Sequence, residues 1–351
     1  MALEVSIKKR LSLFDLDVSF VAENETVALL GASGCGKSMT LKCIAGIEKP
    51  DSGRIVLNGR VLFDSEKKIN LPPQKRRVGY LFQQYALFPN MTVRQNIAAG
   101  ARGKKDTDGK IDGLIKTFHL EGLENKRPNQ LSGGQQQRTA LARILANEPE
   151  ILLLDEPFSA LDSYLRWELE MQLKDTLETY GGTAVFVSHN RDEVYHLCSS
   201  VCVINDGRSE EKEAVKELYA SPKTLSACIL SGCRNVSSIE RRGDGTVFAS
   251  DWGVELHPAG EVRSEHCYVG VRSGSVRPVR DGEKPENAFL CTAERVVEDV
   301  HRYSIILATP GGREGRSCIR METSKKNGEK VKTGDKLLIY IEPADIILLR
   351  K

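Results

Sequence analysis

The most informative segment of the chain is the octapeptide Gly31-Ala32-Ser33-Gly34-Cys35-Gly36-Lys37-Ser38. It fits the pattern G-x-x-x-x-G-K-S and stands between an apolar run, Thr26–Leu30, and a segment with helical spacing, Met39–Gly46. Glycines in such a loop let backbone N–H groups turn toward phosphates, and the N-terminus of the following helix adds a partial positive charge. The sequence therefore predicts a strand–loop–helix unit that holds a nucleotide triphosphate.

The predicted site extends over the whole loop and one residue beyond it, Gly31 to Met39. Lys37 is expected to neutralise the β- and γ-phosphates, and the Ser38 hydroxyl to ligate Mg²⁺. Two carboxylates, Asp155 and Glu156, end a second apolar strand. We expect Asp155 to hold Mg²⁺ through water and Glu156 to polarise the attacking water. Such a pair is common by itself, but together with the octapeptide it indicates hydrolysis of the nucleotide.

Single polar residues follow two other predicted strands. Gln83 comes after Val78–Phe82, and His189 comes after Ala184–Ser188. We expect these two strands to be neighbours in a parallel sheet, so that both residues point into the crevice at its carboxyl edge.

A second glycine-rich turn opens a helix at Leu131-Ser132-Gly133-Gly134-Gln135. A helix N-terminus of this kind also suits an anion. The chain thus carries one phosphate-binding element more than a self-contained pocket needs.

The order of patterns predicts two domains. Residues 1–230 alternate buried strands with helices, which indicates a parallel α/β sheet, and a helical subdomain of about residues 86–148 is inserted into it. Residues 231–351 contain short strands separated by glycine-rich turns, which indicates an all-β module, most simply a small barrel. We place the boundary near 228–232.

Bulk properties exclude several classes of function. The chain has 351 residues with 50 Lys and Arg against 48 Asp and Glu, so its net charge of +2 indicates no nucleic-acid partner. The nine cysteines lack metal-binding spacing and predict reduced thiols. Apolar runs are far shorter than a membrane span. Any role at a membrane is therefore expected to pass through a partner subunit.

The segment Leu131–Arg138 resembles the signature motif of ABC-type ATPases, and the other marks of that family follow in order. Gln83 matches the Q-loop glutamine, Ser159-Ala160-Leu161-Asp162 the D-loop, and His189 the switch histidine. The resemblance implies ATP and Mg²⁺ as cofactors, with Glu156, His189 and Gln83 in catalysis and Ser38, Gln83 and Asp155 around the metal.

The same resemblance implies a homodimer. Ser132, Gly133 and Gly134 of one subunit, followed by Gln135, would contact the γ-phosphate held by the octapeptide of the other, and Asp162 would bridge the subunits. The surplus phosphate motif is then the half-site that each subunit supplies to its partner.

The segment Leu81–Val93 is similar to that of bacterial importers of sulfate, molybdate, ferric ion and polyamines. The similarity implies two integral-membrane permease subunits, an indirect link to a substrate-binding protein, and a place at the cytoplasmic face of the membrane. Tyr85 and Phe88 are expected as exposed anchors for a permease helix, or alternatively as core of the helical subdomain.

The region after 230 resembles the regulatory OB-type (TOBE/MOP-like) domain of these importers, through Tyr268–Arg272 and Ile341–Ile346. The segments Lys9–Phe20 and Leu230–Asn235 resemble those of molybdate-type members, and this resemblance favours molybdate as the transported solute. Sulfate or thiosulfate, ferric ion and polyamine are alternatives, and a non-transport ABC ATPase is a further one. Arg272 or Arg234 could contact an oxyanion, although such arginines are more often surface residues.

Two departures from the family pattern stand out. No aromatic residue occupies the expected adenine-stacking place near Lys8–Arg10, so Arg10, Leu11 or Phe14 is expected to contact the base. Asn190 replaces the Asp that usually follows the switch histidine, and we expect this to matter little.

Overall fold

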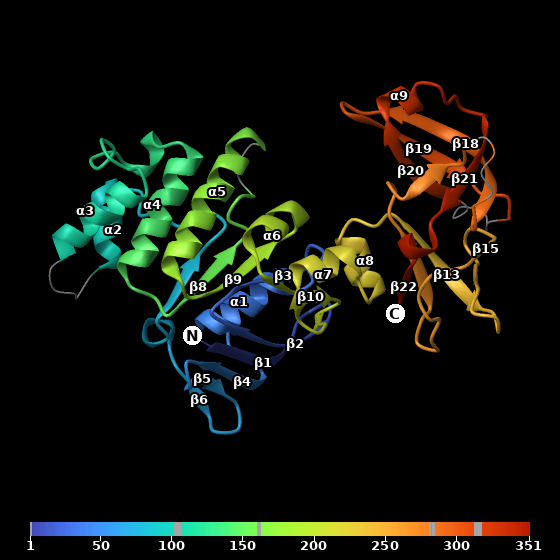
Figure 1. Cartoon of the computed structure of the whole chain (residues 1–351). Helices are drawn as coiled ribbons and strands as arrows, with labels where there is room; N and C mark the ends of the chain where they lie inside the picture. Colours follow the sequence, from blue (N-terminus) through green and yellow to red (C-terminus); the bar gives the residue numbers. More distant parts are fainter. Residues whose placement is uncertain (1, 102–106, 160–162, 281, 283–284, 312–317) are drawn as a thin grey trace. The chain divides into compact units, whose positions relative to one another are not determined.

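The computed structural model describes residues 2–101, 107–159, 163–280, 282, 285–311 and 318–351 (Figure 1). The chain forms two compact units, Met1–Val215 and Lys216–Lys351. No helix in the described part of the chain is long and apolar enough to cross a membrane.

The first unit is built on one large sheet with the strand order β6-β5-β4-β1-β2-β11-β10-β3-β9-β8-β7, and β12 pairs with β10. The strands are β1 (Ala2–Arg10), β2 (Asp15–Glu23), β3 (Thr26–Leu30), β4 (Ser52–Leu57), β5 (Arg60–Asp64), β6 (Ile69–Asn70), β7 (Val78–Leu81), β8 (Ile151–Asp155), β9 (Thr183–Ser188), β10 (Ser200–Asn205), β11 (Arg208–Ser209) and β12 (Glu213–Ala214). The run from β10 to β7 is parallel, and the arm from β6 to β2 is antiparallel. The predicted α/β class is confirmed, as a mixed sheet with a parallel half.

The central parallel strands β8 and β9 are buried along their whole length because helices cover them on both sides. Every residue of β8 and β9 is buried. Figure 1 shows α1 (Lys37–Ala45) on one side of these strands and α5 (Ser163–Tyr180) and α6 (Arg191–Leu197) on the other. Double-sided burial explains why these strands are nearly continuous apolar runs in the sequence.

The predicted adjacency of the strands before Gln83 and His189 is wrong. Strand β8 lies between β7 and β9 and pairs in parallel with both. The chain leaves β7 for the helical block and returns as β8 between β7 and β9, so β8 separates the two strands by one place. The carboxyl ends still meet at one edge of the sheet.

The helical block between β7 and β8 contains α2 (Val93–Gly100), α3 (Thr107–Thr117) and α4 (Gly133–Ala146). A capping box opens α2 through Thr92 and Gln95. Helices α2 and α4 approach so closely that a Cβ on Gly100 would lie 2.0 Å from the carbonyl oxygen of Arg143. Glycine is therefore required at this crossing.

The second unit begins with two short helices, α7 (Val215–Ala220) and α8 (Leu225–Leu230). Two antiparallel five-stranded sheets follow, in the orders β15-β14-β13-β16-β22 and β17-β21-β18-β19-β20. Their strands are β13 (Asn235–Arg241), β14 (Val247–Ala249), β15 (Val254–Leu256), β16 (Tyr268–Val271), β17 (Val276–Pro278), β18 (Ala288–Glu298), β19 (Arg302–Ala308), β20 (Cys318–Ser324), β21 (Lys336–Ile341) and β22 (Ile347–Leu349). One apolar core, including Trp252, Val269, Ile305 and Ile339, joins the two sheets. The predicted all-β, barrel-like module is confirmed.

Candidate nucleotide-binding site

The predicted loop joins β3 to α1 at the carboxyl edge of the sheet. Gly34 and Gly36 have φ values of +82° and +106°, which favour glycine and turn successive backbone amides to the same side. A Cβ on Gly31 would lie 2.3 Å from the carbonyl oxygen of Ile204 on β10, so the loop starts in direct contact with the neighbouring strand. The three glycines are therefore required by backbone geometry.

Lys37 lies inside this loop and is only 5% exposed. Its Nζ donates hydrogen bonds to the carbonyl oxygens of Gly31, at 2.9 Å, and Ala32, at 2.8 Å. The ammonium group is thus held at the centre of the amide-lined turn, where it suits phosphate oxygens.

Asp155 ends β8 beside the loop and accepts two hydrogen bonds. The Ser38 hydroxyl donates to its Oδ1 at 2.7 Å, and the Tyr80 hydroxyl donates to its Oδ2 at 2.8 Å. Burial and the neighbouring Asp155 carboxylate raise the pKa of Tyr80, so its hydroxyl remains a donor. A hydroxyl and a carboxylate oxygen this close fit the hard oxygen ligands that Mg²⁺ prefers.

Glu156 and His189 face each other at the ends of β8 and β9. His189 Nδ1 lies 3.5 Å from Glu156 Oε1. Glu156 has a left-handed backbone with φ of +46°, and its N–H donates to the carbonyl of Val187. Non-glycine residues adopt this conformation mainly where the surroundings hold them. The geometry presents the Glu156 carboxylate to the loop.

A cavity of about 410 Å³ opens over the loop. The β1–β2 turn forms one wall, and the phosphate loop with Glu156 forms the other. Its lining residues are Leu11, Ser12, Leu13, Phe14, Ser33, Gly34, Gly36, Lys37, Ser38, Met39, Lys42 and Glu156. Of the residues expected to contact the base, Leu11 and Phe14 line this cavity, while Arg10 lines a different one.

The glycine-rich turn at residues 131–135 lies apart from this cavity and lines none of it. Ser132 is the N-cap of α4: the Gln135 N–H donates to its Oγ, and its own N–H donates to Gln135 Oε1. The turn is therefore a preformed helix start, in which Ser132 is exposed and Gly134 is buried. Gln83 is exposed two residues beyond β7, and Asp162 lies outside the described residues.

Of the two expected aromatic anchors, only Phe88 is exposed. Tyr85 is 5% exposed, and its hydroxyl donates to the carbonyl of Pro157, so the prediction of an exposed Tyr85 is wrong. Phe88 is 47% exposed and lies against the guanidinium of Arg143. Neither Tyr80 nor Arg143 was identified from the sequence, because each acts through a contact with a distant segment.

Asn190 caps α6 by accepting a hydrogen bond from Asp192 N–H. An asparagine fills this capping role as well as an aspartate does.

In the second unit, Arg272 donates hydrogen bonds to the carbonyls of Tyr219 and Ser231 and to the Ser231 hydroxyl. Its guanidinium is thus engaged by the segment before β13. Arg234 is exposed. Nothing in this arrangement converges on an oxyanion.

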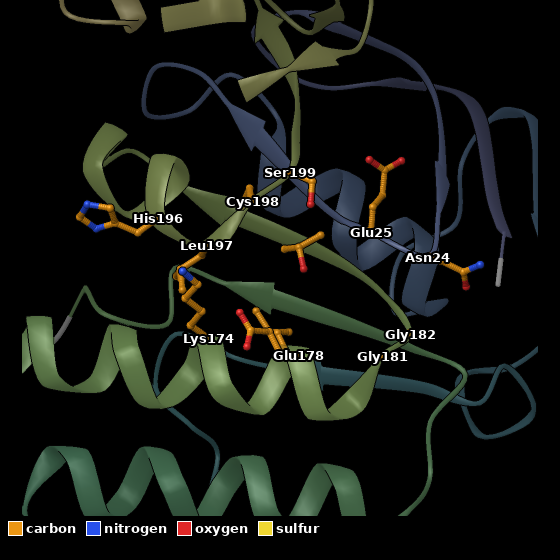
Figure 2. Close-up of a pocket in the computed structure, with 12 residues that line it drawn as sticks. Asn24, Glu25, Lys174, Glu178, Gly181, Gly182, His196, Leu197, Cys198 and Ser199 are labelled. Carbon is orange, nitrogen blue, oxygen red and sulfur yellow. The ribbon is translucent and has the colours of Figure 1, made fainter. Parts of the chain in front are cut away.

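A second cavity, of about 320 Å³, lies at the amino edge of the same sheet (Figure 2). Its polar side chains do not converge. Figure 2 shows His196 and Asn24 at opposite ends, pointing away from each other. Glu25 pairs with Lys212, and His196 pairs with Glu170. It shares no lining residue with the cavity over the phosphate loop, so the two cavities are separate.

Comparison with known proteins agrees with this geometry. Residues 15–159 match the family model described as ABC transporter. Over 335 residues the chain is 36% identical to the spermidine/putrescine import ATP-binding protein PotA of Acetivibrio thermocellus, covering 94% of this chain and 90% of that protein. The chain belongs to the ABC transporter family.

The names of other relatives in this family mention a different solute. The sulfate/thiosulfate import ATP-binding protein CysA of Caulobacter vibrioides is 37% identical over 303 residues, which is 84% of each chain. Among solved structures, the dimeric post-hydrolysis ATP-binding cassette MJ0796 bound to ADP and Pi is 31% identical with a TM-score of 0.51. It covers 61% of this chain and 99% of that one, so the resemblance is to the cassette alone.

Proposed function

We propose that this protein is the ATP-hydrolysing subunit of an ABC importer. The observation that carries the proposal is the meeting of Lys37, Ser38, Asp155, Glu156 and His189 at the carboxyl ends of three adjacent parallel strands. The cavity over them has apolar side chains at one end and the phosphate loop at the other. Family membership and the import subunits among the relatives support the same activity.

Each side chain has a distinct role in this proposal. The loop amides and Lys37 bind the triphosphate, and Ser38 and Asp155, together with Gln83, would hold Mg²⁺. Bound Mg²⁺ neutralises charge on the phosphate oxygens. Glu156 accepts the proton of the attacking water, and His189, 3.5 Å away, orients that carboxylate and contacts the γ-phosphate. Leu11, Leu13 and Phe14 offer an apolar wall for the adenine.

The active form is proposed to be a homodimer. The signature turn of Ser132, Gly133, Gly134 and Gln135 is preformed but remote from its own cavity, so we assign it to the nucleotide of the partner subunit. The dimeric cassette of similar sequence supports this assignment. Asp162 is proposed to contact the partner.

A Glu156→Gln variant tests activity and assembly together. It should bind MgATP, hydrolyse it at least about 100-fold more slowly than the wild type, and elute as a dimer with ATP but as a monomer without it. A matched Ser132→Arg change in the same variant should keep ATP binding and abolish the dimer. A monomer at saturating ATP would contradict the proposal that two subunits share each nucleotide site. Unchanged hydrolysis would contradict the role of Glu156.

For the transported solute, the relatives' names favour a polyamine or sulfate over the molybdate expected from the sequence. We propose the polyamine–sulfate group, in partnership with two permease subunits and a substrate-binding protein at the cytoplasmic face of the membrane. Uptake of labelled spermidine, sulfate and molybdate by cells with and without the gene distinguishes the three. If cells without the gene lost only molybdate uptake, molybdate would be the transported solute and this assignment would be wrong.

A further inference from the structure

The surface segment of residues 83–92, between β7 and α2, contains one buried side chain in an exposed setting. Gln83, Gln84, Ala86 and Phe88 are exposed, whereas the Tyr85 ring is buried. Tyr85 and Ala86 have φ values of +57° and +46°. Two consecutive left-handed residues that are not glycine persist only where neighbouring groups hold them.

Two side chains of the helical block hold this backbone. Arg143 on α4 donates to the carbonyls of Tyr85, at 3.0 Å, and Ala86, at 2.8 Å, and its guanidinium lies 5.2 Å from the centre of the Phe88 ring. Asn96 on α2 is fully buried and exchanges hydrogen bonds with the N–H and carbonyl of Phe88. The segment is therefore anchored on the side of the helical block.

The third anchor lies on the catalytic side. The Tyr85 hydroxyl donates a buried hydrogen bond of 3.2 Å to the carbonyl oxygen of Pro157, the residue next to Glu156. Burial raises the pKa of Tyr85 to about 12, so this hydroxyl keeps its proton at physiological pH. The backbone of Glu156 is also fixed by its bond to Val187 and by Ser159, which donates to its carbonyl. One side-chain bond thus links the exposed segment to the strained turn that presents Glu156.

We propose that Tyr85 is a positioning residue that mechanically couples segment 83–92 to the catalytic turn. The inference rests on the proposed ATPase function and assigns a positioning role in it to the bond from the Tyr85 hydroxyl to the Pro157 carbonyl. A shift of the Glu156 turn on nucleotide binding displaces the Tyr85 ring and, with it, the left-handed pair. The coupling is reciprocal in free energy, so a partner bound to segment 83–92 biases the Glu156 turn in return.

The chain provides a matched control. Tyr180 has its hydroxyl bonded to the carbonyl of Pro149 at 3.0 Å, and burial raises its pKa to about 12 as well. This second bond joins α5 to the start of β8 and does not involve segment 83–92. Tyr85→Phe deletes one hydroxyl from a buried ring and Tyr180→Phe deletes one from a half-buried ring. Neither change creates a cavity, so both variants are expected to fold.

Steady-state hydrolysis by the full-length chain separates positioning from general structure. Tyr85→Phe should lower kcat about tenfold. The KM for ATP should stay within about twofold of the wild type, because the change does not touch the phosphate loop of residues 31–38. Tyr180→Phe should leave both constants near wild-type values. Equal kcat values for the two variants would overturn the role of Tyr85.

Hydrogen exchange measures the coupling directly. In a Glu156→Gln background, MgATP should change amide exchange in segment 83–92 by at least about threefold, and Tyr85→Phe should abolish that change. Residues 31–45 should be protected by MgATP in all variants, which shows that nucleotide is bound. Absent protection there, with no hydrolysis by the wild type, would defeat the proposed function. Protection there with an unaltered response of segment 83–92 in Tyr85→Phe would defeat only this inference.

Discussion

Replacing Tyr80 by Phe provides a quantitative test of the bonding around Asp155. The change deletes one hydroxyl and preserves the ring, so the buried carboxylate loses its 2.8 Å donor on Oδ2 and keeps Ser38 on Oδ1. Asp155 is only 7% exposed, so water cannot easily replace the lost donor. A hydrogen bond to a charged group contributes about 2 kcal/mol to stability, about twice the contribution of a bond to a neutral group.

The neutral reference is again Tyr180→Phe, in which the lost acceptor is a backbone carbonyl. For a unit of this size, 1 kcal/mol shifts Tm by about 3 °C. Tyr80→Phe should therefore lower the Tm of the first unit by about 6 °C, and Tyr180→Phe by about 3 °C. Calorimetry of the full-length chain resolves this difference.

A Tyr80→Phe variant that unfolds at the same temperature as Tyr180→Phe would refute the reasoning. It would mean that the Tyr80 hydroxyl contributes no more to stability than a hydroxyl bonded to a backbone carbonyl. A Tyr80→Phe/Ser38→Ala double variant removes both donors, and its loss of stability should exceed the sum of the single losses because the carboxylate then has neither bond.

Three further outcomes are expected. Gly31→Ala should weaken binding of a fluorescent ATP analogue by about tenfold or more, because its Cβ would lie 2.3 Å from the carbonyl oxygen of Ile204 and must displace the loop; unchanged affinity would show that the loop tolerates the shift. Burial alone would raise the pKa of Glu25. Hydrogen bonds, of which the bond from Lys212 has the largest effect, outweigh burial and lower the pKa below the ordinary value of 4.5. Its stabilising effect is then present above pH 4.5 and is lost as the pH falls through the native pKa, so Glu25→Gln should cost about 1 kcal/mol in urea unfolding at pH 7 and little near pH 3; a cost independent of pH would contradict this. Alkylation of Cys35 should block ATP binding sterically and MgATP should slow that alkylation, while Cys35→Ala should hydrolyse ATP and resist the reagent; an inactive Cys35→Ala would indicate a larger role for the thiol.

Sequence patterns predicted the elements whose signal is local. The unit of β3, phosphate loop and α1 was predicted within two residues, and the strands before Gln83 and His189 were predicted within one residue. Each of these strands is a short apolar run followed by polar or glycine-rich residues. Strand β1 was missed, although Leu3, Val5 and Ile7 alternate as a half-buried strand requires.

The features that could not be predicted depend on contacts between distant segments. The position of β8 between β7 and β9 follows from a crossover that local patterns do not specify. The burial of Tyr85 follows from a left-handed turn held by Arg143, 58 residues away. The residues of the nucleotide site were named from motifs, but the Tyr80 bond to Asp155 appears only when β7 and β8 are paired.

Helix α4 has a consequence for how the two ends of the subunit communicate. It begins at the Ser132 cap and carries Arg143 three turns later, at a rise that separates them by about 16 Å. An α-helix of this length resists compression, so it holds the Ser132 turn, which we propose contacts the partner's nucleotide, at a fixed distance from Arg143 and the Phe88 ring that Arg143 contacts. If the dimer closes as proposed, a displacement of the Ser132 turn along the helix axis moves Arg143 by the same distance, because the helix does not shorten. The displacement of the Arg143 end of the helix is then set by how far the two subunits approach each other.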